Sequence, residues 1–203
     1  MTDTGRLTVL STSSFTTVAT DADIQLNTTT NQFADTVTVN TAGTAGLDDA
    51  EIHGGSTPLK IIASGGVGTL KLTTTGSIAP ITDEGALVVA GVTTIDADRS
   101  DVTLDHSSSN LQGAVGASGL NVALTHNQSA GLILGDSTVT GTYDITATTG
   151  SITDSGNLAI TGLTTLVTSA DGADITLDGT GHTFTGNVKV TTNETGTNKD
   201  AHA

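Results

Sequence analysis

The side chains of this 203-residue chain that could do chemistry are concentrated in short acidic clusters. The densest cluster consists of Asp96, Asp98 and Asp101 around Arg99. If this stretch is extended, Asp96 and Asp98 share one face. Two carboxylates on either side of a cleft could act on a glycosidic bond, and a carboxylate face could also hold a cation or a sugar. Lyase chemistry needs a positioned basic side chain beside the acids, and Arg99 is the candidate.

The acidic clusters also have a simpler interpretation as turns. Asp171 and Asp174 stand at the matching place later in the chain, and Asp21 and Asp23 do so earlier. Asp favours turn geometry because its side chain hydrogen-bonds the local backbone. An acidic pair that recurs in every unit therefore fits a turn requirement better than a unique active site. We assign no catalytic, cofactor-binding or metal-binding residue and expect no enzymatic activity and no cofactor.

The remaining motifs also point away from a catalytic site. The five histidines have no metal-ligand spacing, and we interpret them as exposed turn residues: His53, His106, His126, His182 and His202. Residues 64–72 (SGGVGTLKL) begin like a calcium-binding nonapeptide but lack its Asp. Gly65 and Gly66 are expected to serve a turn with positive φ. There is no dinucleotide fingerprint, P-loop lysine or nucleophile elbow.

Composition excludes several classes of protein. The net charge of -15, from 21 acidic and 6 basic residues, argues against nucleic-acid binding and against docking on anionic membranes. Cysteine is absent, so no disulfide framework exists. No apolar stretch approaches the length of about 18 residues that a membrane helix needs, and the N-terminus does not resemble a signal peptide. The acidity is expected to keep the exterior soluble; a face that collects divalent cations is the alternative.

The elements that must position these side chains are short strands. From Gly150 to Val190, apolar and polar residues alternate in short runs that Gly, Asn or Asp interrupt every six to ten residues. Thr and Val favour a pleated surface because their branched side chains restrict χ1. Thr is expected to face outward, and its Thr-x-Thr pairs lack the fixed register that an ice-binding lattice would need. These features predict an all-β protein.

The chain repeats itself. Residues 82–95 (TDEGALVVAGVTTI) match residues 153–166 (TDSGNLAITGLTTL) position by position. A second landmark, Asp-Ile/Val-x-Leu, stands at 23–26, 101–104 and 174–177, with offsets of 78 and 73 residues. We expect one solenoid over residues 5–190, made of three degenerate units at about 5–75, 76–149 and 150–190. Residues 191–203 are expected to form a polar disordered tail.

A unit of this length suits three or four coils of a right-handed parallel β-helix. Stacked coils bury columns of Val, Ile and Leu without large aromatic residues, and aromatic residues make up only 2% of this chain. Some nine or ten coils, at about 4.8 Å each, predict a rod of roughly 45 Å. The alternative is a string of immunoglobulin-like sandwiches, which the missing core Trp and the short strands disfavour.

The repeat pattern resembles the filamentous-haemagglutinin-type repeats of large bacterial surface and secreted adhesins. The third unit carries GSITDSGNLAITGLTTL, ADITLD and HTFTGNVKV, and the second carries the same blocks with a three-residue insert after GSI. The first unit keeps only DIQL and NQFADTV. The resemblance covers most of residues 70–190. It implies a β-helical shaft with a structural, adhesive role outside the cell, and it is specific for no ligand.

The expected function is a non-enzymatic, extracellular rod or stalk segment of a bacterial adhesin or surface filament. The alternative is a β-helical passenger that binds or degrades carbohydrate, for which Tyr143 is the candidate aromatic platform. Because open coil ends expose unpaired strand edges, the expected partners are flanking coils of a longer parent chain or further copies of the chain associated end to end. A host or cell-surface glycan or protein is a further candidate partner. No partnership with nucleic acid and no insertion into membranes is expected.

Overall fold

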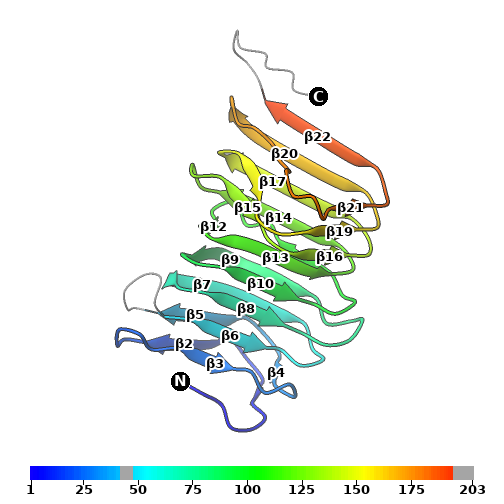
Figure 1. Cartoon of the computed structure of the whole chain (residues 1–203). Helices are drawn as coiled ribbons and strands as arrows, with labels where there is room; N and C mark the ends of the chain where they lie inside the picture. The colour runs from blue at the N-terminus through cyan, green and yellow to red at the C-terminus, as the bar shows by residue number, and fades with distance from the viewer. Residues whose placement is uncertain (42–47, 194–203) are drawn as a thin grey trace.

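The structure is a computed structural model in which residues 1–41 and 48–193 are described. It is an all-β parallel solenoid of about eight turns, close to the nine or ten coils predicted from the sequence. Strands stack one above another from the N-terminal end to the C-terminal end (Figure 1). Every strand pairing in the described ranges is parallel, and these residues contain no helix. The predicted fold class is confirmed.

Two ten-stranded sheets run the length of the solenoid. The first sheet contains β3 (Ile24–Leu26), β6 (Ala50–His53), β8 (Leu70–Thr73), β10 (Thr93–Asp96), β13 (Ala114–Gly119), β15 (Leu132–Leu134), β16 (Ser137–Val139), β18 (Ile152–Asp154), β19 (Leu158–Ile160) and β21 (Thr183–Phe184). The second contains β2 (Ser13–Thr17), β5 (Val37–Thr41), β7 (Leu59–Val67), β9 (Ile81–Val89), β11 (Val102–Leu104), β12 (Asn110–Leu111), β14 (Val122–Asn127), β17 (Tyr143–Thr149), β20 (Thr164–Asp171) and β22 (Val188–Asn193). A third, two-stranded sheet joins β1 (Thr8–Val9) to β4 (Gln32–Phe33) near the N-terminus.

The core consists of apolar columns that run along the axis. In the first sheet Leu26 pairs with Ile52, Ile52 with Leu72, and Leu72 with Ile95. All four side chains are buried. Each coil covers the apolar residue of the coil below, so the stack removes area from water without needing large rings.

Several glycines adopt the positive φ that the sequence predicts for Gly65 and Gly66. These two residues have φ values of 83° and 78°, but they lie inside β7 at a shift of strand register, so the prediction of a turn there is wrong. Gly76 and Gly150, which open the second and third units, also have positive φ. Side chains with a Cβ rarely adopt this backbone region, and this explains why the unit boundaries are marked by glycine.

Six of the described threonines are buried, which contradicts the expectation that Thr faces outward. Thr93 stacks between Leu70 and Val115, and it is fully buried. Thr164 is likewise fully buried, and it pairs with Tyr143. Parallel register decides which face a residue takes, and the shape of Thr matches that of Val closely enough to continue an apolar column.

The polar C-terminal segment also departs from its prediction. Thr191–Asn193 belong to β22, although residues 191–203 were expected to form a disordered tail. Asn193 pairs with Asp171, and its Nδ2 donates a 2.9 Å hydrogen bond to the carbonyl oxygen of Ser169. Hydrogen bonds to the preceding coil thus order these polar residues. Residues 194–203 lie outside the described residues.

The sequence unit is longer than a whole number of coils. From Ile24, three coils lead to Thr93 and a fourth leads to Val115, all in the first sheet. The second landmark residue, Val102, lies between Thr93 and Val115, and it belongs to the second sheet.

The third landmark behaves in the same way. From Val102, three coils lead to Thr164 and a fourth leads to Val188. Ile175 lies between these two residues and bridges Ile152 of β18. Each unit therefore spans three coils and a fraction, so the motif falls on different sheets in neighbouring units: on the first sheet at Ile24, on the second at Val102, and beside β18 of the first sheet again at Ile175.

Candidate functional site

The acidic cluster at Asp96–Asp101 forms a turn. Asp98 has a φ of 50°, so the segment is not extended as a shared carboxylate face would require. The Asp98 N–H donates a 3.0 Å hydrogen bond to Asp96 Oδ1, and the Gly76 N–H donates to Asp98 Oδ2 at 3.0 Å. Asp101 Oδ1 accepts a 2.9 Å hydrogen bond from the side-chain amide of Asn121. The three carboxylates therefore bond to the turn and to neighbouring coils, as the turn interpretation predicts.

Arg99 does not complete an acid–base site. Its Nε lies 3.8 Å from Asp98 Oδ1, and the two side chains are 79% and 44% exposed. An exposed pair at this distance is screened by water and contributes little to stability. The arrangement lacks the enclosed, opposed carboxylates that glycoside hydrolysis uses.

A recurring contact between coils accounts for many of the acidic residues. The Asp49 N–H donates to Asp23 Oδ1 at 3.1 Å, and the Thr69 N–H donates in turn to Asp49 Oδ1 at 2.7 Å. The same kind of contact, from a backbone N–H to a side-chain oxygen one coil away, recurs at Asp48, Asp83, Asp101, Asn121, Asp136 and Asp154. These bonds satisfy turn N–H groups that have no strand partner. Sequence reasoning missed this role because coil lengths vary and conceal the spacing.

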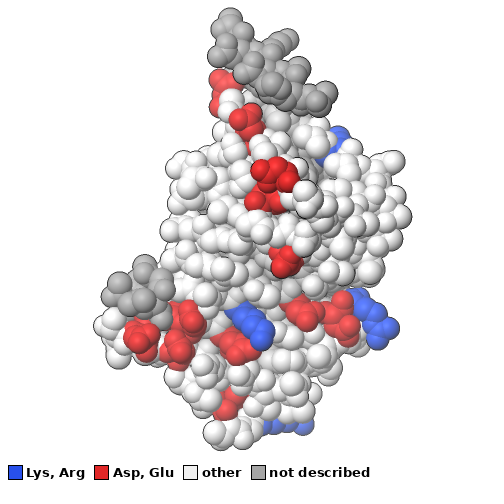
Figure 2. All heavy atoms as spheres, in the orientation of Figure 1, with Lys and Arg blue, Asp and Glu red and all other residues white. Residues whose placement is uncertain are grey.

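The outer face of the first sheet carries a small polar network. Glu51 accepts hydrogen bonds from Lys71 Nζ at 2.7 Å and from Asn27 Nδ2 at 3.0 Å. The hydrogen bond from Lys71, followed by that from Asn27, lowers the pKa of Glu51 below its usual value. Figure 2 shows Asp and Glu spread along this face of the molecule with few Lys or Arg between them. The face of the molecule shown in Figure 2 is acidic.

Asp83 is a half-buried acid whose pKa is shifted by its burial. Desolvation raises the pKa of its carboxyl, and hydrogen bonds from the His106 and Asp105 N–H groups oppose that effect.

Within the described ranges, no group of three or more His, Cys, Asp or Glu side chains could hold a metal ion. No helix in those ranges is long and apolar enough to cross a membrane.

The interpretation of the histidines as exposed turn residues is wrong for three of them. His53 lies in β6 and His126 in β14, and both are buried. His182 precedes β21, and only 10% of its side chain is exposed. His106 is half-buried, and His202 lies outside the described residues. Sequence reasoning missed this burial because no histidine recurs at the paired positions: His53 pairs with Thr73, and His126 pairs with Ala147.

His182 and Asp154 form a buried pair in the last coils. His182 Nε2 lies 3.2 Å from Asp154 Oδ2, an ion-pair distance without hydrogen-bond alignment. His182 Nδ1 accepts a hydrogen bond from the Leu158 N–H, and Asp154 Oδ1 accepts one from the Asp178 N–H. The pair fixes the segment before β21 to the coil below.

His126 gives the stability of the fold a pH dependence. Its ring is fully buried, its Nδ1 accepts a 3.4 Å hydrogen bond from the Leu111 N–H, and desolvation lowers its pKa below 6.5. The unfolded chain therefore takes up a proton that the folded chain excludes, and stability falls as the pH drops below about 6.5. We expect the melting temperature to fall between pH 7 and pH 5, and to fall less steeply in His126→Gln.

Calorimetry or circular dichroism between pH 7 and pH 5 measures how steeply the melting temperature of the wild-type chain and of His126→Gln changes with pH. His53 contributes in the same direction, because burial lowers its pKa as well. The melting temperature of the double variant His53→Gln, His126→Gln should therefore depend even less on pH than that of His126→Gln. Equal slopes for the wild-type chain and His126→Gln would contradict the assignment.

Tyr143 does not provide a sugar-stacking platform. The side chain is 1% exposed and points into the core, where burial raises the pKa of its hydroxyl to about 12. Phe33 is also buried, and Phe15 and Phe184 pack partly against the core. The described aromatic residues therefore leave no flat exposed ring, and the carbohydrate alternative loses the residue on which it depended.

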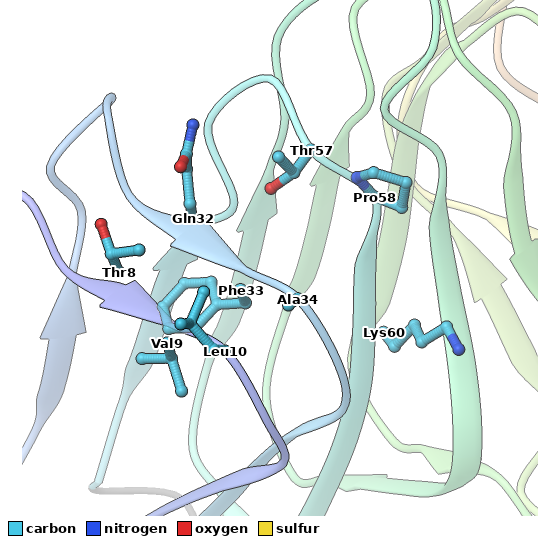
Figure 3. Close-up of a pocket in the computed structure, with 9 residues that line it drawn as sticks. All are labelled: Thr8, Val9, Leu10, Gln32, Phe33, Ala34, Thr57, Pro58 and Lys60. Carbon is cyan, nitrogen blue, oxygen red and sulfur yellow. The ribbon is translucent and has the colours of Figure 1, made fainter.

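An apolar groove of about 310 Å³ lies beside β1 and β4 (Figure 3). Leu10, which is 83% exposed, lies close to Val9 and Phe33 in this groove. The full lining is Thr8, Val9, Leu10, Gln32, Phe33, Ala34, Thr57, Pro58 and Lys60. This lining contains neither a carboxylate nor a histidine, so the groove suits apolar contact better than acid–base chemistry.

The repeats themselves match a known family. A model described as repeats of unknown function (DUF5649) matches residues 1–40, 47–118 and 119–191. The chain belongs to the DUF5649 repeat family. No curated protein and no solved structure matches it. The last two DUF5649 matches begin at residues 47 and 119, a spacing close to the 73-residue offset of the sequence landmarks.

Proposed function

We propose that this chain is a non-enzymatic segment of the stalk of an extracellular bacterial adhesin or surface filament, similar to filamentous-haemagglutinin-type shafts. The observation that carries the proposal is the continuous parallel stack, in which apolar columns such as Leu26–Ile52–Leu72–Ile95 pass from coil to coil. A stack of this kind transmits load along its axis through hydrogen bonds and packed side chains. Its mechanism would be that of a stiff spacer.

The surface supports the same role. The acidic side chains are largely engaged in turns, and the net charge of -15 keeps a stalk soluble and separate from its neighbours. The cluster with the densest acids, Asp96–Asp101, bonds to backbone and to a neighbouring coil. Little of the described surface is arranged to act on a bound molecule.

A glycan screen of the full chain, for binding and for turnover, tests the non-enzymatic part of the proposal. We expect no saturable turnover of any glycan. Turnover that disappears in Asp98→Ala or Arg99→Ala would replace the stalk with the carbohydrate-degrading alternative. Glu84→Ala, which removes an exposed acid paired with Lys60 at 3.5 Å, is the matched control.

Labelling of the source cells tests the location. An antibody raised against the chain should bind intact cells as strongly as permeabilised ones. A signal that requires permeabilisation would contradict an extracellular stalk.

A further inference from the structure

The second sheet ends in an open edge at each end of the solenoid. Among the described residues, β22 pairs only with β20 and β2 pairs only with β5. On the first sheet the N-terminal edge is partly covered, because Thr2 bridges Gln25 and the Asp3 N–H donates to the Gln25 carbonyl. The open-edged end strands of the second sheet are therefore β2 and β22, while β21 of the first sheet and β1 also pair on one side only.

At the C-terminal end, the last residues of the apolar columns are exposed to water. Val188 pairs with Thr164, and Val190 pairs with the buried Leu166. The register thus makes Val188 and Val190 the inward residues of β22, yet they are 45% and 54% exposed. Two inward valines that are exposed to water give the β22 edge an apolar row that a further strand could cover.

At the N-terminal end, the inward residues of β2 are covered by the next coil on one side only. Ser13, Phe15 and Thr17 pair with Val37, Val39 and Thr41. Phe15 is only partly buried, and its ring meets that of Phe33 edge to face at 6.3 Å. β2 therefore presents an inward row with the same alternation as β22.

The backbone of each edge strand is also free to pair. The Ser13 N–H bonds the Thr36 carbonyl, so in an alternating strand the N–H groups of Ser14 and Thr16 point to the open side. The Thr164 N–H donates a hydrogen bond to the Asn187 carbonyl. Because backbone groups alternate along a strand, the N–H and carbonyl groups of Val188 and Val190 point away from β20. Both edges thus carry unused donors and acceptors.

We propose that β22 of one copy pairs in parallel with β2 of a second copy, so that the chains stack head to tail. Strand direction and alternation match, and Val188 and Val190 would lie over the inward row of Ser13, Phe15 and Thr17. Two β22 edges could meet only in antiparallel fashion, which would break the coil on the other faces. Because the contact is heterologous and does not close, it extends into a filament.

Sedimentation velocity of the full chain over a concentration series tests this contact. The mean mass of the wild-type chain should at least double between the lowest and highest concentrations. Val190→Lys places an inward charge on β22, and Thr16→Pro removes an N–H from the open side of β2, where proline is tolerated. Each variant alone should remain monomeric, and their equimolar mixture should stop at dimers, because one free edge of each kind remains.

Val92→Lys is the matched control. Val92 lies between β9 and β10, is 47% exposed, and is remote from both ends, so this variant should associate as the wild-type chain does. Circular dichroism checks that every variant folds, and Ser14→Pro replaces Thr16→Pro if the latter melts early. A wild-type chain that stays monomeric at all concentrations would overturn the proposal, as would a Thr16→Pro chain that still dimerises by itself. The contact deepens the proposed stalk role but rests on the strand edges, so its failure would leave the glycan and labelling results intact.

Discussion

Replacing Gly162 with alanine is expected to destabilise the solenoid by about 3 kcal/mol, the upper end of typical overpacking costs. An ideal Cβ on Gly162 would overlap the carbonyl oxygen of Gly141, one coil below. The obstacle is backbone rather than a side chain that could rotate away, and the Gly162 N–H bonds that same carbonyl at 3.1 Å. Gly186 repeats the arrangement on Gly162. Thermal unfolding followed by circular dichroism should show a melting temperature lower by about 8 °C.

Gly5→Ala is the control for this prediction. No atom lies within 4 Å of an ideal Cβ at Gly5, and its φ is not in the positive range. Its melting temperature should stay within about 1 °C of the wild type, since surface substitutions rarely exceed ±0.5 kcal/mol. Equal melting temperatures for Gly162→Ala and Gly5→Ala would contradict the explanation that close backbone stacking requires glycine at positions 141, 162 and 186.

Replacing Leu72 with alanine should cost about 3 kcal/mol in the free energy of unfolding, as large-to-small changes in a packed core do. Leu72 is fully buried between Ile52 and Ile95. Its loss would leave a gap in the middle of a column, with little freedom for rigidly stacked coils to close it. Urea denaturation with a constant m-value would measure the difference.

The next residue along β8 is the matched control. Lys71 points outward and bonds Glu51 at 2.7 Å, with 55% and 31% of the two side chains exposed. Because exposed ion pairs are worth less than about 1 kcal/mol, Lys71→Ala should leave the midpoint nearly unchanged. Equal losses for Lys71→Ala and Leu72→Ala would mean that the columns do not dominate stability.

Much of the fold could be read from local patterns. Alternation of Val, Ile and Leu with Thr and Asp predicts the strands, and recurring landmarks predict the repeat. Positive φ at Gly65 and Gly66 could be predicted because no other residue enters this backbone region so readily, although the two glycines lie inside β7 and not in a turn. The turn interpretation of Asp98 holds for a related reason, since Asp is among the few other residues that tolerate this backbone region.

The roles of single polar side chains could not be read in this way. His126, Thr93 and Tyr143 have sequence surroundings that suit either face of a strand, yet all three are buried. Their position follows from pairing with residues about 20 to 26 positions away, and that spacing changes from coil to coil. The contacts of Asp23 with Asp49, and of Asp49 with Thr69, depend on the same variable spacing.

The sequence by itself determined that this protein is a repetitive all-β solenoid, because strand alternation, turn glycines and repeats are properties of neighbouring residues. Only the tertiary structure decided which acids and histidines remain available for chemistry. The acids of the Asp96–Asp101 turn bond to backbone and to a neighbouring coil, and His126 is enclosed in the core. The physical reason is that each unit spans three coils and a fraction, so copies of a motif in neighbouring units fall on different sheets. What a residue contacts is therefore fixed by the coil above and the coil below it.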